Sequence, residues 1–359
     1  MKPLKVLHCT HALSGGGAER QLDLLCAHEH QHGLEHSTFY MEAGKAAVHP
    51  DRHLIRFHRR HKLDLGVFRS VGEAIDTVKP DLVHAWLPPV MTVPACVMAN
   101  RRGVPIVTSF RSAKRFRNWL GLIDFCTSWA LGNGVISNTL PQLCQRPYQR
   151  MFDRQHGRLI PNAVSVPAVD DLNAPTRSEN FQVLYVGRIV PEKNWQCMAS
   201  ALSLLPANTP IRLSVCGDGF ELAAFEKMVA EKDVGHLIEF EGYVSDVYQR
   251  IVNADALLLP SWTEGMPNVV VEAMALSTPT ILSDIGANRA IVGDSQSSLM
   301  FDPNKPLELA QRLEQLAGDP GLAKKLAQRG KIVAEGYTVD RMVSAYREYY
   351  DDVLARARS

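Results

Sequence analysis

Short apolar segments alternate with helical segments along the first half of the chain, and this alternation restricts the folds that the chain can adopt. The segments expected to form strands are residues 5–11, 36–40, 81–85, 104–109 and 134–137. Helices are predicted between them at residues 18–30, 67–78, 90–100 and 119–130. Short buried strands joined by amphipathic helices form a parallel sheet with helices on both faces. The sequence therefore predicts an α/β protein.

The length of the chain and its charge distribution both indicate two domains. A chain of 359 residues is too long for one comfortable hydrophobic core. Residues 1–170 hold 21 Lys and Arg against 13 Asp and Glu, whereas residues 171–359 hold 18 against 25. Residues 165–180 carry prolines and short polar side chains without periodicity, as linkers do. We therefore predict domains at residues 1–165 and 166–338, with a helical region at residues 306–336, followed by a last helical segment at 339–359.

Several features favour a globular protein of the cytoplasm. Hydrophobic residues make up 46% and charged residues 21% of the chain, as in soluble globular proteins. No apolar run reaches the roughly 18–20 residues that a membrane-spanning helix needs. The first residues enter a predicted strand without a signal-peptide pattern. The seven cysteines are scattered without a C-x-x-C spacing, which indicates reduced core residues rather than disulfides or zinc ligands.

The second half contains a strand–turn–helix pattern at residues 255–276 that is suited to binding a phosphate. Pro267 is well placed at the helix start, where its missing N–H costs nothing. Gly265, Met266 and Asn268 then offer backbone N–H groups at the helix N-terminus. Such an arrangement binds a phosphate or pyrophosphate without a metal.

Two carboxylates bracket this turn. Glu264 lies in the turn, and Glu272 lies about one helical turn further on, so both can face the same ligand. A carboxylate accepts two hydrogen bonds from a sugar diol, as the acidic residue of dinucleotide-binding folds does with ribose. An ordinary strand–turn–helix unit with two solvated glutamates is the alternative interpretation, and the spacing alone does not separate the two.

A pair of cations follows the first predicted strand of the second domain. Arg188 and Lys193 lie in the loop after the strand at residues 181–187. An arginine binds two phosphate oxygens as a fork, and a lysine adds a point charge. The pair could neutralise a diphosphate without a divalent ion, and two ordinary surface cations are the alternative.

The first domain offers weaker candidates. Gly16 and Gly17 belong to a glycine-rich loop that opens the first helix, where the protein backbone can come close to a ligand and the helix N-terminus favours an anion. Arg111 follows the strand at residues 104–109, at the edge of the sheet where open α/β folds bind ligands, and is a candidate for an acceptor phosphate. His84 is expected to be a packed, hydrogen-bonded histidine. A histidine cluster is interpreted as a solvated helix end rather than a metal site; it comprises His28, His30, His32 and His36.

Two basic stretches, residues 52–62 and 111–123, mix cations with aromatic or aliphatic side chains. This composition suits a segment that lies on an anionic membrane surface. Nucleic acid would also accept the charges, but no nucleic-acid-binding motif accompanies them, so no nucleic-acid partner is predicted. A solvated helix face is the remaining alternative.

Four of these segments resemble the family 4 retaining glycosyltransferases. The residues that carry the resemblance are the Glu-x7-Glu pattern from Glu264 to Glu272, the run from Gly187 to Asn194, the glycine-rich loop ending at Glu19, and residues 159–162. The resemblance implies a GT-B fold, with two facing Rossmann-like domains and a cleft between them. It further implies an acceptor-side first domain, a second domain that binds the nucleotide sugar, and a last helix that crosses back to the first domain.

The resemblance also implies roles for individual residues. Glu272 would hold the nucleotide ribose, Glu264 would lie against the donor sugar, and Arg188 and Lys193 would bind the diphosphate. Gly16 and Gly17 would face the donor phosphates, and the backbone at Val244 would meet the base. No metal or other cofactor is required in this scheme.

The sequence thus predicts a retaining glycosyltransferase that uses a nucleotide-diphosphate sugar, with UDP as the expected carrier. A hydroxyl of a glycan or polyprenyl-linked saccharide is the expected acceptor, in cell-envelope polysaccharide synthesis. The protein is expected in the cytoplasm or peripherally on the cytoplasmic face of the inner membrane. Two alternatives remain: a nucleotide-sugar 2-epimerase or hydrolase of the same architecture, and a non-catalytic sugar-nucleotide-binding module at the membrane.

Overall fold

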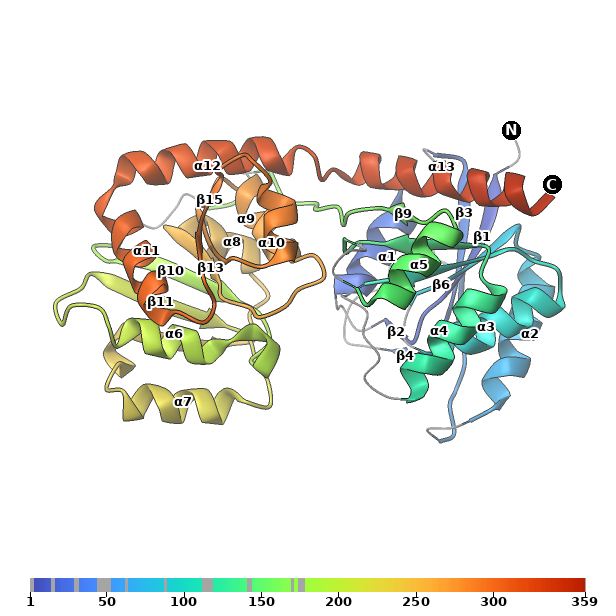
Figure 1. The fold of residues 1–359 in the computed structure, drawn as a ribbon, viewed down its shortest axis with the longest axis horizontal. Helices are drawn as coiled ribbons and strands as arrows, with labels where there is room; N and C mark the ends of the chain where they lie inside the picture. Colours follow the sequence, from blue (N-terminus) through green and yellow to red (C-terminus); the bar gives the residue numbers. More distant parts are fainter. Residues whose placement is uncertain are drawn as a thin grey trace. The chain divides into compact units, whose positions relative to one another are not determined.

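The computed structural model describes residues 3–13, 17–28, 32–43, 53–61, 64–86, 89–111, 119–140, 144–168, 171–173 and 178–358 (Figure 1). The chain divides into two compact units. Unit 1 comprises Met1–Ala163 together with Val339–Ser359, and unit 2 comprises Val164–Thr338. Each unit is built on a parallel sheet, so the predicted α/β fold with two Rossmann-like domains is confirmed.

Unit 1 contains a seven-stranded parallel sheet in the order β5-β3-β1-β6-β7-β8-β9. The strands are β1 (Leu4–Cys9), β3 (Leu34–Tyr40), β5 (His53–Arg56), β6 (Leu82–Ala85), β7 (Ile106–Phe110), β8 (Gly134–Ser137) and β9 (Arg158–Leu159). The short strands β2 (Ala12–Leu13) and β4 (Glu42–Ala43) pair separately. From β1 the chain moves outward to β3 and β5 and then returns to β6 on the other side of β1. The strand order therefore reverses between β1 and β6.

The helices of unit 1 cover both faces of this sheet. They are α1 (Gly17–Ala27), α2 (Gly66–Val78), α3 (Pro89–Arg101), α4 (Trp119–Leu131), α5 (Arg146–Arg154) and α13 (Val339–Arg358). One apolar cluster joins the sheet to α1 and α13, and a second joins the other face to α2 and α3. All four residues of β6 are buried, because helices cover both sides of the strand.

The last helix, α13, is part of the core of unit 1. Tyr349 Oη accepts a hydrogen bond from the backbone N–H of Val135 at 2.9 Å. Tyr350 Oη lies 2.7 Å from His84 Nδ1. Three tyrosines of this helix are fully buried at a helical spacing, so its apolar face closes one side of the sheet.

Unit 2 contains a six-stranded parallel sheet in the order β12-β11-β10-β13-β14-β15. The strands are β10 (Phe181–Val186), β11 (Ile211–Cys216), β12 (Ile238–Gly242), β13 (Ala256–Leu259), β14 (Thr280–Ser283) and β15 (Ser298–Phe301). The chain moves outward from β10 to β11 and β12, then returns to β13 on the other side of β10. The strand order therefore reverses between β10 and β13.

Helices again cover both faces in unit 2 (Figure 1). They are α6 (Trp195–Leu202), α7 (Leu222–Glu231), α8 (Val247–Asn253), α9 (Asn268–Ala275), α10 (Gly286–Val292), α11 (Pro306–Gly318) and α12 (Pro320–Ala334). One cluster joins the sheet to α6, α7 and α11, and the other joins it to α8, α9, α10 and α12.

The structure corrects some predicted boundaries. Residues 306–336 were expected to be one helical region, but the helix stops at Gly318 and restarts at Pro320. Asp319 explains the break, because its side chain caps the new helix by accepting a hydrogen bond from Leu322 N at 2.9 Å. The first predicted strand also ends two residues early, at Cys9.

Candidate functional site

Two loops of unit 2 follow the neighbouring strands at which the strand order reverses. The loop after β10 carries Arg188 and Lys193, and the loop after β13 carries Glu264. Open α/β sheets bind their ligands outside the carboxyl ends of the strands at such a switch point. The topology therefore brings three of the sequence-predicted residues to the expected ligand site.

Hydrogen bonds connect these two loops to each other. Trp262 N donates to the carbonyl oxygen of Glu192 at 2.9 Å. Asn194 Nδ2 lies 3.1 Å from the carbonyl oxygens of both Pro260 and Pro303 and donates to them. Asn194 is buried and has a φ of +53°, a left-handed conformation that asparagine adopts more readily than most residues. These hydrogen bonds link the two loops directly.

Lys193 and Glu264 form an ion pair across this junction. Lys193 Nζ lies 2.6 Å from Glu264 Oε1, and the two side chains are only 19% and 11% exposed. Ser261 Oγ donates to the same Oε1 atom, also at 2.6 Å. Charge-assisted hydrogen bonds of this length are among the stronger polar contacts in proteins, and partial burial limits their screening by salt. Both side chains are therefore held in defined positions.

The backbone at Arg188 is also fixed, while its side chain is exposed. Tyr185 Oη donates to the carbonyl oxygen of Arg188 at 3.0 Å. Burial, and then the charge of Glu264, raises the pKa of Tyr185, so its hydroxyl stays a donor. A Cβ atom on Gly217, whose φ is +150°, would lie 1.9 Å from the carbonyl oxygen of Gly187. Only glycine allows these two strand ends to approach so closely.

Helix α9 begins directly after this cluster. Pro267 occupies its N-cap position and supplies no side-chain acceptor, so no side chain caps the first turn. Gly265 and Met266 precede it and are half-buried, as is Asn268 at the first helical position. Glu272 lies one turn further on and is only 4% exposed. The predicted strand–turn–helix is present, with Pro267 one position earlier than a first-turn proline.

Val244 follows β12, the strand at one edge of the sheet, whereas α9 follows the more central strand β13. Val244 is partly buried against the cluster that contains α8 and α9. The adjacent Tyr243 is 88% exposed. The sequence-predicted donor residues in unit 2 thus follow β10, β12 and β13 at the same edge of one sheet.

In unit 1, the structure describes two of the predicted ligand-binding residues, Gly17 and Arg111. Gly16 lies outside the described residues, and Gly17 is the exposed first residue of α1. Arg111 makes contacts within unit 1: its Nη1 donates to Asn162 Oδ1 at 3.1 Å, and its Nη2 donates to Tyr346 Oη. Its guanidinium carbon also lies 4.1 Å from the ring centre of Trp86. Arg111 is therefore a structural residue in this conformation, and the predicted acceptor contact stays a prediction.

Three buried histidines line the face of the unit 1 sheet that α1 and α13 cover. His8 Nε2 lies 2.8 Å from His36 Nδ1, and the rings of His8 and His84 are 5.5 Å apart. His84 Nε2 lies 2.6 Å from Ser109 Oγ, and burial followed by the charge of Arg111 lowers the pKa of His84 well below 6.5. The expectation of a packed His84 is confirmed, whereas the assignment of His36 to a solvated helix end is wrong, because His36 lies buried on β3.

The histidine pair also approaches Cys26, and the three potential metal ligands lie within 4.8 Å of one another. Trp86 Nε1 donates to His8 Nδ1 at 2.9 Å. Indole N–H is a donor only, so a neutral His8 must carry its proton on Nε2, the atom that faces His36. A metal-bound histidine instead donates from its second nitrogen. The cluster therefore fits a hydrogen-bonded network better than a metal site.

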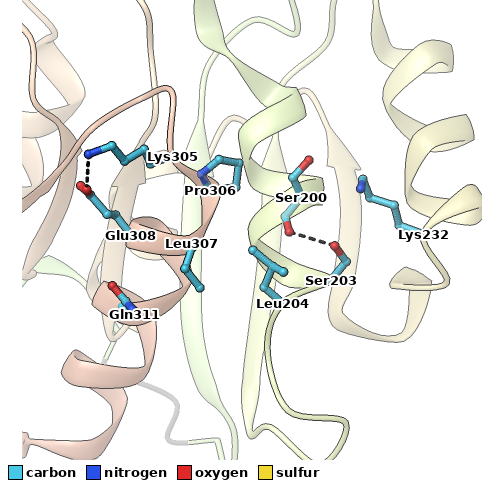
Figure 2. Close-up of a pocket in the computed structure, with 9 residues that line it drawn as sticks. All are labelled: Ser200, Ser203, Leu204, Lys232, Lys305, Pro306, Leu307, Glu308 and Gln311. Carbon is cyan, nitrogen blue, oxygen red and sulfur yellow. Dashed lines mark hydrogen bonds and ion pairs between the residues drawn. The ribbon is translucent and has the colours of Figure 1, made fainter.

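A separate groove lies among α6, α7 and α11 (Figure 2). Leu204 and Leu307 expose apolar surface there, while Lys305 pairs with Glu308 at 2.9 Å and Ser203 bonds to the Ser200 carbonyl. None of the residues that line this groove was predicted to bind the donor. The groove is therefore a feature distinct from the switch-point cluster.

Family comparisons agree with this geometry. Residues 15–166 match the family model described as Glycosyltransferase Family 4, and residues 172–333 match the model described as Glycosyl transferases group 1. The two matches together span most of the chain. The chain belongs to the family 4 glycosyltransferases. The Glu264–Glu272 and Gly187–Asn194 segments of this glycosyltransferase both lie within the second match.

Individual relatives extend over the same length. The lipopolysaccharide core biosynthesis glycosyltransferase LpsE of Rhizobium meliloti is 24% identical over 352 residues, which cover 96% of this chain and 98% of LpsE. The crystal structure of Anabaena HepE in complex with UDP and glucose has a TM-score of 0.81 at 18% identity, covering 97% of this chain and all of HepE. The apo lipopolysaccharide outer core galactosyltransferase WaaB has a TM-score of 0.74 at 17% identity, covering 96% and 98%. These neighbours establish the GT-B fold for this glycosyltransferase.

Sequence inspection did not single out three residues that shape this glycosyltransferase's switch-point cluster: Tyr185, Asn194 and Ser261. Tyr185 and Ser261 contact the predicted residues Arg188 and Glu264, respectively. Asn194 instead links the two loops through the carbonyl oxygen of Pro260. Asn194 and Ser261 lie within or beside the motifs, so their positions were a usable signal. The contact of Tyr185 with the backbone of Arg188 depends on the turn and is not visible in a motif.

Proposed function

We propose that the enzyme transfers a sugar from a UDP-sugar to a hydroxyl of a lipid-linked or lipopolysaccharide-type saccharide, with retention at the anomeric carbon. The observation that carries the proposal is the placement of Arg188, Lys193 and Glu264 on two linked loops at the switch point of unit 2. The UDP and glucose bound by HepE support a UDP-linked donor. The lipopolysaccharide role named for LpsE and WaaB supports the acceptor class.

The proposed chemistry assigns the leaving group to the cations. As the bond from the sugar to the diphosphate breaks, Arg188, Lys193 and the N-terminus of α9 stabilise the charge that develops on the phosphate oxygens. Glu272 orients the ribose and Glu264 holds the donor sugar. The departing phosphate takes the proton of the acceptor hydroxyl on the same face of the sugar, which gives retention. No metal or cofactor is assigned a step.

A peripheral contact with an anionic membrane completes the proposal. Helix α4 exposes four large apolar side chains at its beginning: Trp119, Leu120, Leu122 and Ile123, with Trp119 65% exposed. The sequence just before it is rich in cations, although residues 112–118 lie outside the described part of the structure. Apolar side chains beside cations suit the interface of an anionic bilayer. Such a contact would bring the enzyme to a lipid-linked acceptor on the cytoplasmic face of the inner membrane.

No helix in the described part of the chain is both long and apolar enough to cross a membrane.

A vesicle co-sedimentation assay tests the peripheral contact. Wild-type protein is expected to sediment with vesicles that contain anionic phospholipid. A Trp119→Ser, Ile123→Ser double variant is expected to lose about tenfold in partitioning, since it lacks two exposed apolar side chains that would enter the bilayer interface. Equal sedimentation of both proteins would contradict the contact.

Thermal-shift binding tests the donor assignment. UDP, GDP, ADP, CMP and their common sugars are compared with wild type and with Glu272→Ala, because a ligand that binds only the native state raises the melting temperature. We expect a shift with the UDP series that the variant weakens. No shift with any nucleotide at millimolar concentration would contradict the proposed function.

An acceptor-dependence assay separates the transferase from its rivals. A transferase converts the UDP-sugar only when a lipid-linked or core saccharide is present. A 2-epimerase or hydrolase converts the donor alone, and a binding module never converts it. Donor conversion that is independent of every acceptor would therefore overturn the proposal while leaving donor binding intact.

A further inference from the structure

The carboxylate of Glu264 is held asymmetrically. Its two hydrogen-bonding partners, Lys193 Nζ and Ser261 Oγ, contact the same oxygen, Oε1, each at 2.6 Å. Within the described residues, no hydrogen bond reaches the other oxygen, Oε2. A carboxylate has about four acceptor sites on two oxygens, so Oε2 retains its full capacity to accept hydrogen bonds from a ligand.

Ser261 provides the fixed half of this arrangement. Its side chain is fully buried at the end of β13, and its carbonyl oxygen accepts a hydrogen bond from Ser283 Oγ at 2.7 Å. Asn288 Nδ2 in turn donates to the carbonyl oxygen of Ser283 at 2.8 Å. The backbone of Ser261, which carries the hydroxyl, is thus anchored to the end of β14 and to α10.

Lys193 provides the charge but not the orientation. A lysine ammonium is a point charge on a flexible four-carbon stem, so it attracts a carboxylate without selecting one rotation of it. A short hydroxyl on a buried backbone leaves far less freedom, because serine has a single side-chain torsion before its oxygen. The rotation of the Glu264 carboxylate therefore depends on Ser261.

We propose that Ser261 is a positioning residue that turns Oε2 of Glu264 toward the hydroxyls of the donor sugar. This inference rests on the proposed function, since it requires Glu264 to meet that sugar. It assigns to Ser261 an effect on the sugar half of the donor and none on the nucleotide half, which Glu272 and α9 contact in the proposed scheme.

Melting temperatures measured with UDP and with UDP-sugars separate those halves. The shift with UDP alone reports the nucleotide half, and the extra shift with UDP-glucose, UDP-galactose or UDP-N-acetylglucosamine reports the sugar half. For Ser261→Ala we expect the UDP shift of wild type, loss of the extra shift, and about a tenfold lower kcat/KM in the acceptor-dependent assay, the scale of one lost hydrogen bond to a charged group.

Matched variants exclude a general loss of packing. Ser298→Ala removes a buried hydroxyl of the same unit that bonds to Thr280 Oγ1 at 2.5 Å, and it is expected to keep the extra sugar shift. Ser261→Cys leaves no cavity but replaces the hydroxyl by a weak donor, so it is expected to behave like Ser261→Ala even if the alanine variant does not fold.

The outcomes distinguish this inference from the proposed function. A wild-type UDP shift with an unchanged extra sugar shift in both Ser261 variants overturns the role of Ser261 alone. A wild-type protein with a UDP shift but no extra shift for any of the three sugars overturns the contact of Glu264 with the donor sugar, and the inference with it. A wild-type protein without any UDP shift overturns the UDP-sugar proposal itself.

Discussion

The two units share one architecture but use the carboxyl edges of their sheets in opposite ways. At the switch point of unit 2, charged side chains stand on linked loops, and one of them, Arg188, is exposed. At the corresponding edge of unit 1, the polar side chains of His84 and Arg111 contact tyrosines of α13. The comparison shows that a Rossmann-like topology offers a ligand site without dictating one. Whether the edge binds a substrate or the protein's own helix depends on a few side chains.

The largest expected effect is on the charged edge of unit 2. We expect Lys193→Ala to raise the activation barrier by about 2–4 kcal/mol, the cost of losing one donor to a developing oxyanion. Steady-state kcat/KM measures this loss. Lys227→Ala is the matched control, because Lys227 is an exposed lysine on α7 of the same unit. Near-normal turnover of Lys193→Ala would show that the cluster does not act on the leaving group.

A buried hydrogen bond at the edge of unit 1 should matter for stability instead. Tyr350→Phe leaves His84 Nδ1 without its hydroxyl partner, which should lower the free energy of unfolding by about 1–3 kcal/mol. Urea denaturation measures the change, and the UDP melting shift should stay that of wild type. A Tyr350→Phe variant with normal stability but weaker donor binding would show instead that this edge of unit 1 affects the ligand rather than the stability of the unit.

The depressed pKa of His84 predicts a pH dependence of stability. Native His84 stays neutral below pH 6.5, whereas the unfolded chain binds a proton there, so stability falls as the pH decreases. The expected contribution is up to about 1.4 kcal/mol per pH unit below pH 6.5. Urea midpoints from pH 7.5 to 5 for wild type and His84→Gln measure it. Parallel pH profiles for the two proteins would contradict this assignment.

The smallest expected effect concerns Arg111. Arg111→Lys keeps the charge but loses the fork that binds Asn162 and Tyr346 and weakens the stacking on Trp86, so we expect about 1 kcal/mol of lost stability. Thermal denaturation measures that loss. A raised KM for the acceptor with unchanged stability would instead support the acceptor contact predicted from sequence.

Local sequence patterns predicted helices and strands well where turn residues and helix caps determine their ends. The turn from Glu264 to Glu272 follows from a buried strand, a glycine and a proline that lie within a few residues of each other. The break at Asp319 was missed, although a capping aspartate before Pro320 is itself a local signal. Such errors concern boundaries, not architecture.

Contacts between distant residues could not be predicted in the same way. The Lys193–Glu264 pair joins residues 71 positions apart, and Arg111 meets Tyr346 across 235 positions. The sequence identified the Lys193 and Glu264 motifs separately, but only the strand order brings them together. For Arg111, an exposed cation and a stacked structural cation have the same sequence signature, since the partner lies on the last helix.

The contribution of α13 to unit 1 has a consequence for synthesis of the chain. Unit 2 is continuous in sequence and can complete its core as soon as residues up to 338 have left the ribosome. Unit 1 emerges first, yet the face of its sheet that carries His84 and Trp86 lacks α13, one of the two helices that cover it, until the end of the chain is made. The order of synthesis and the order of completion are therefore inverted.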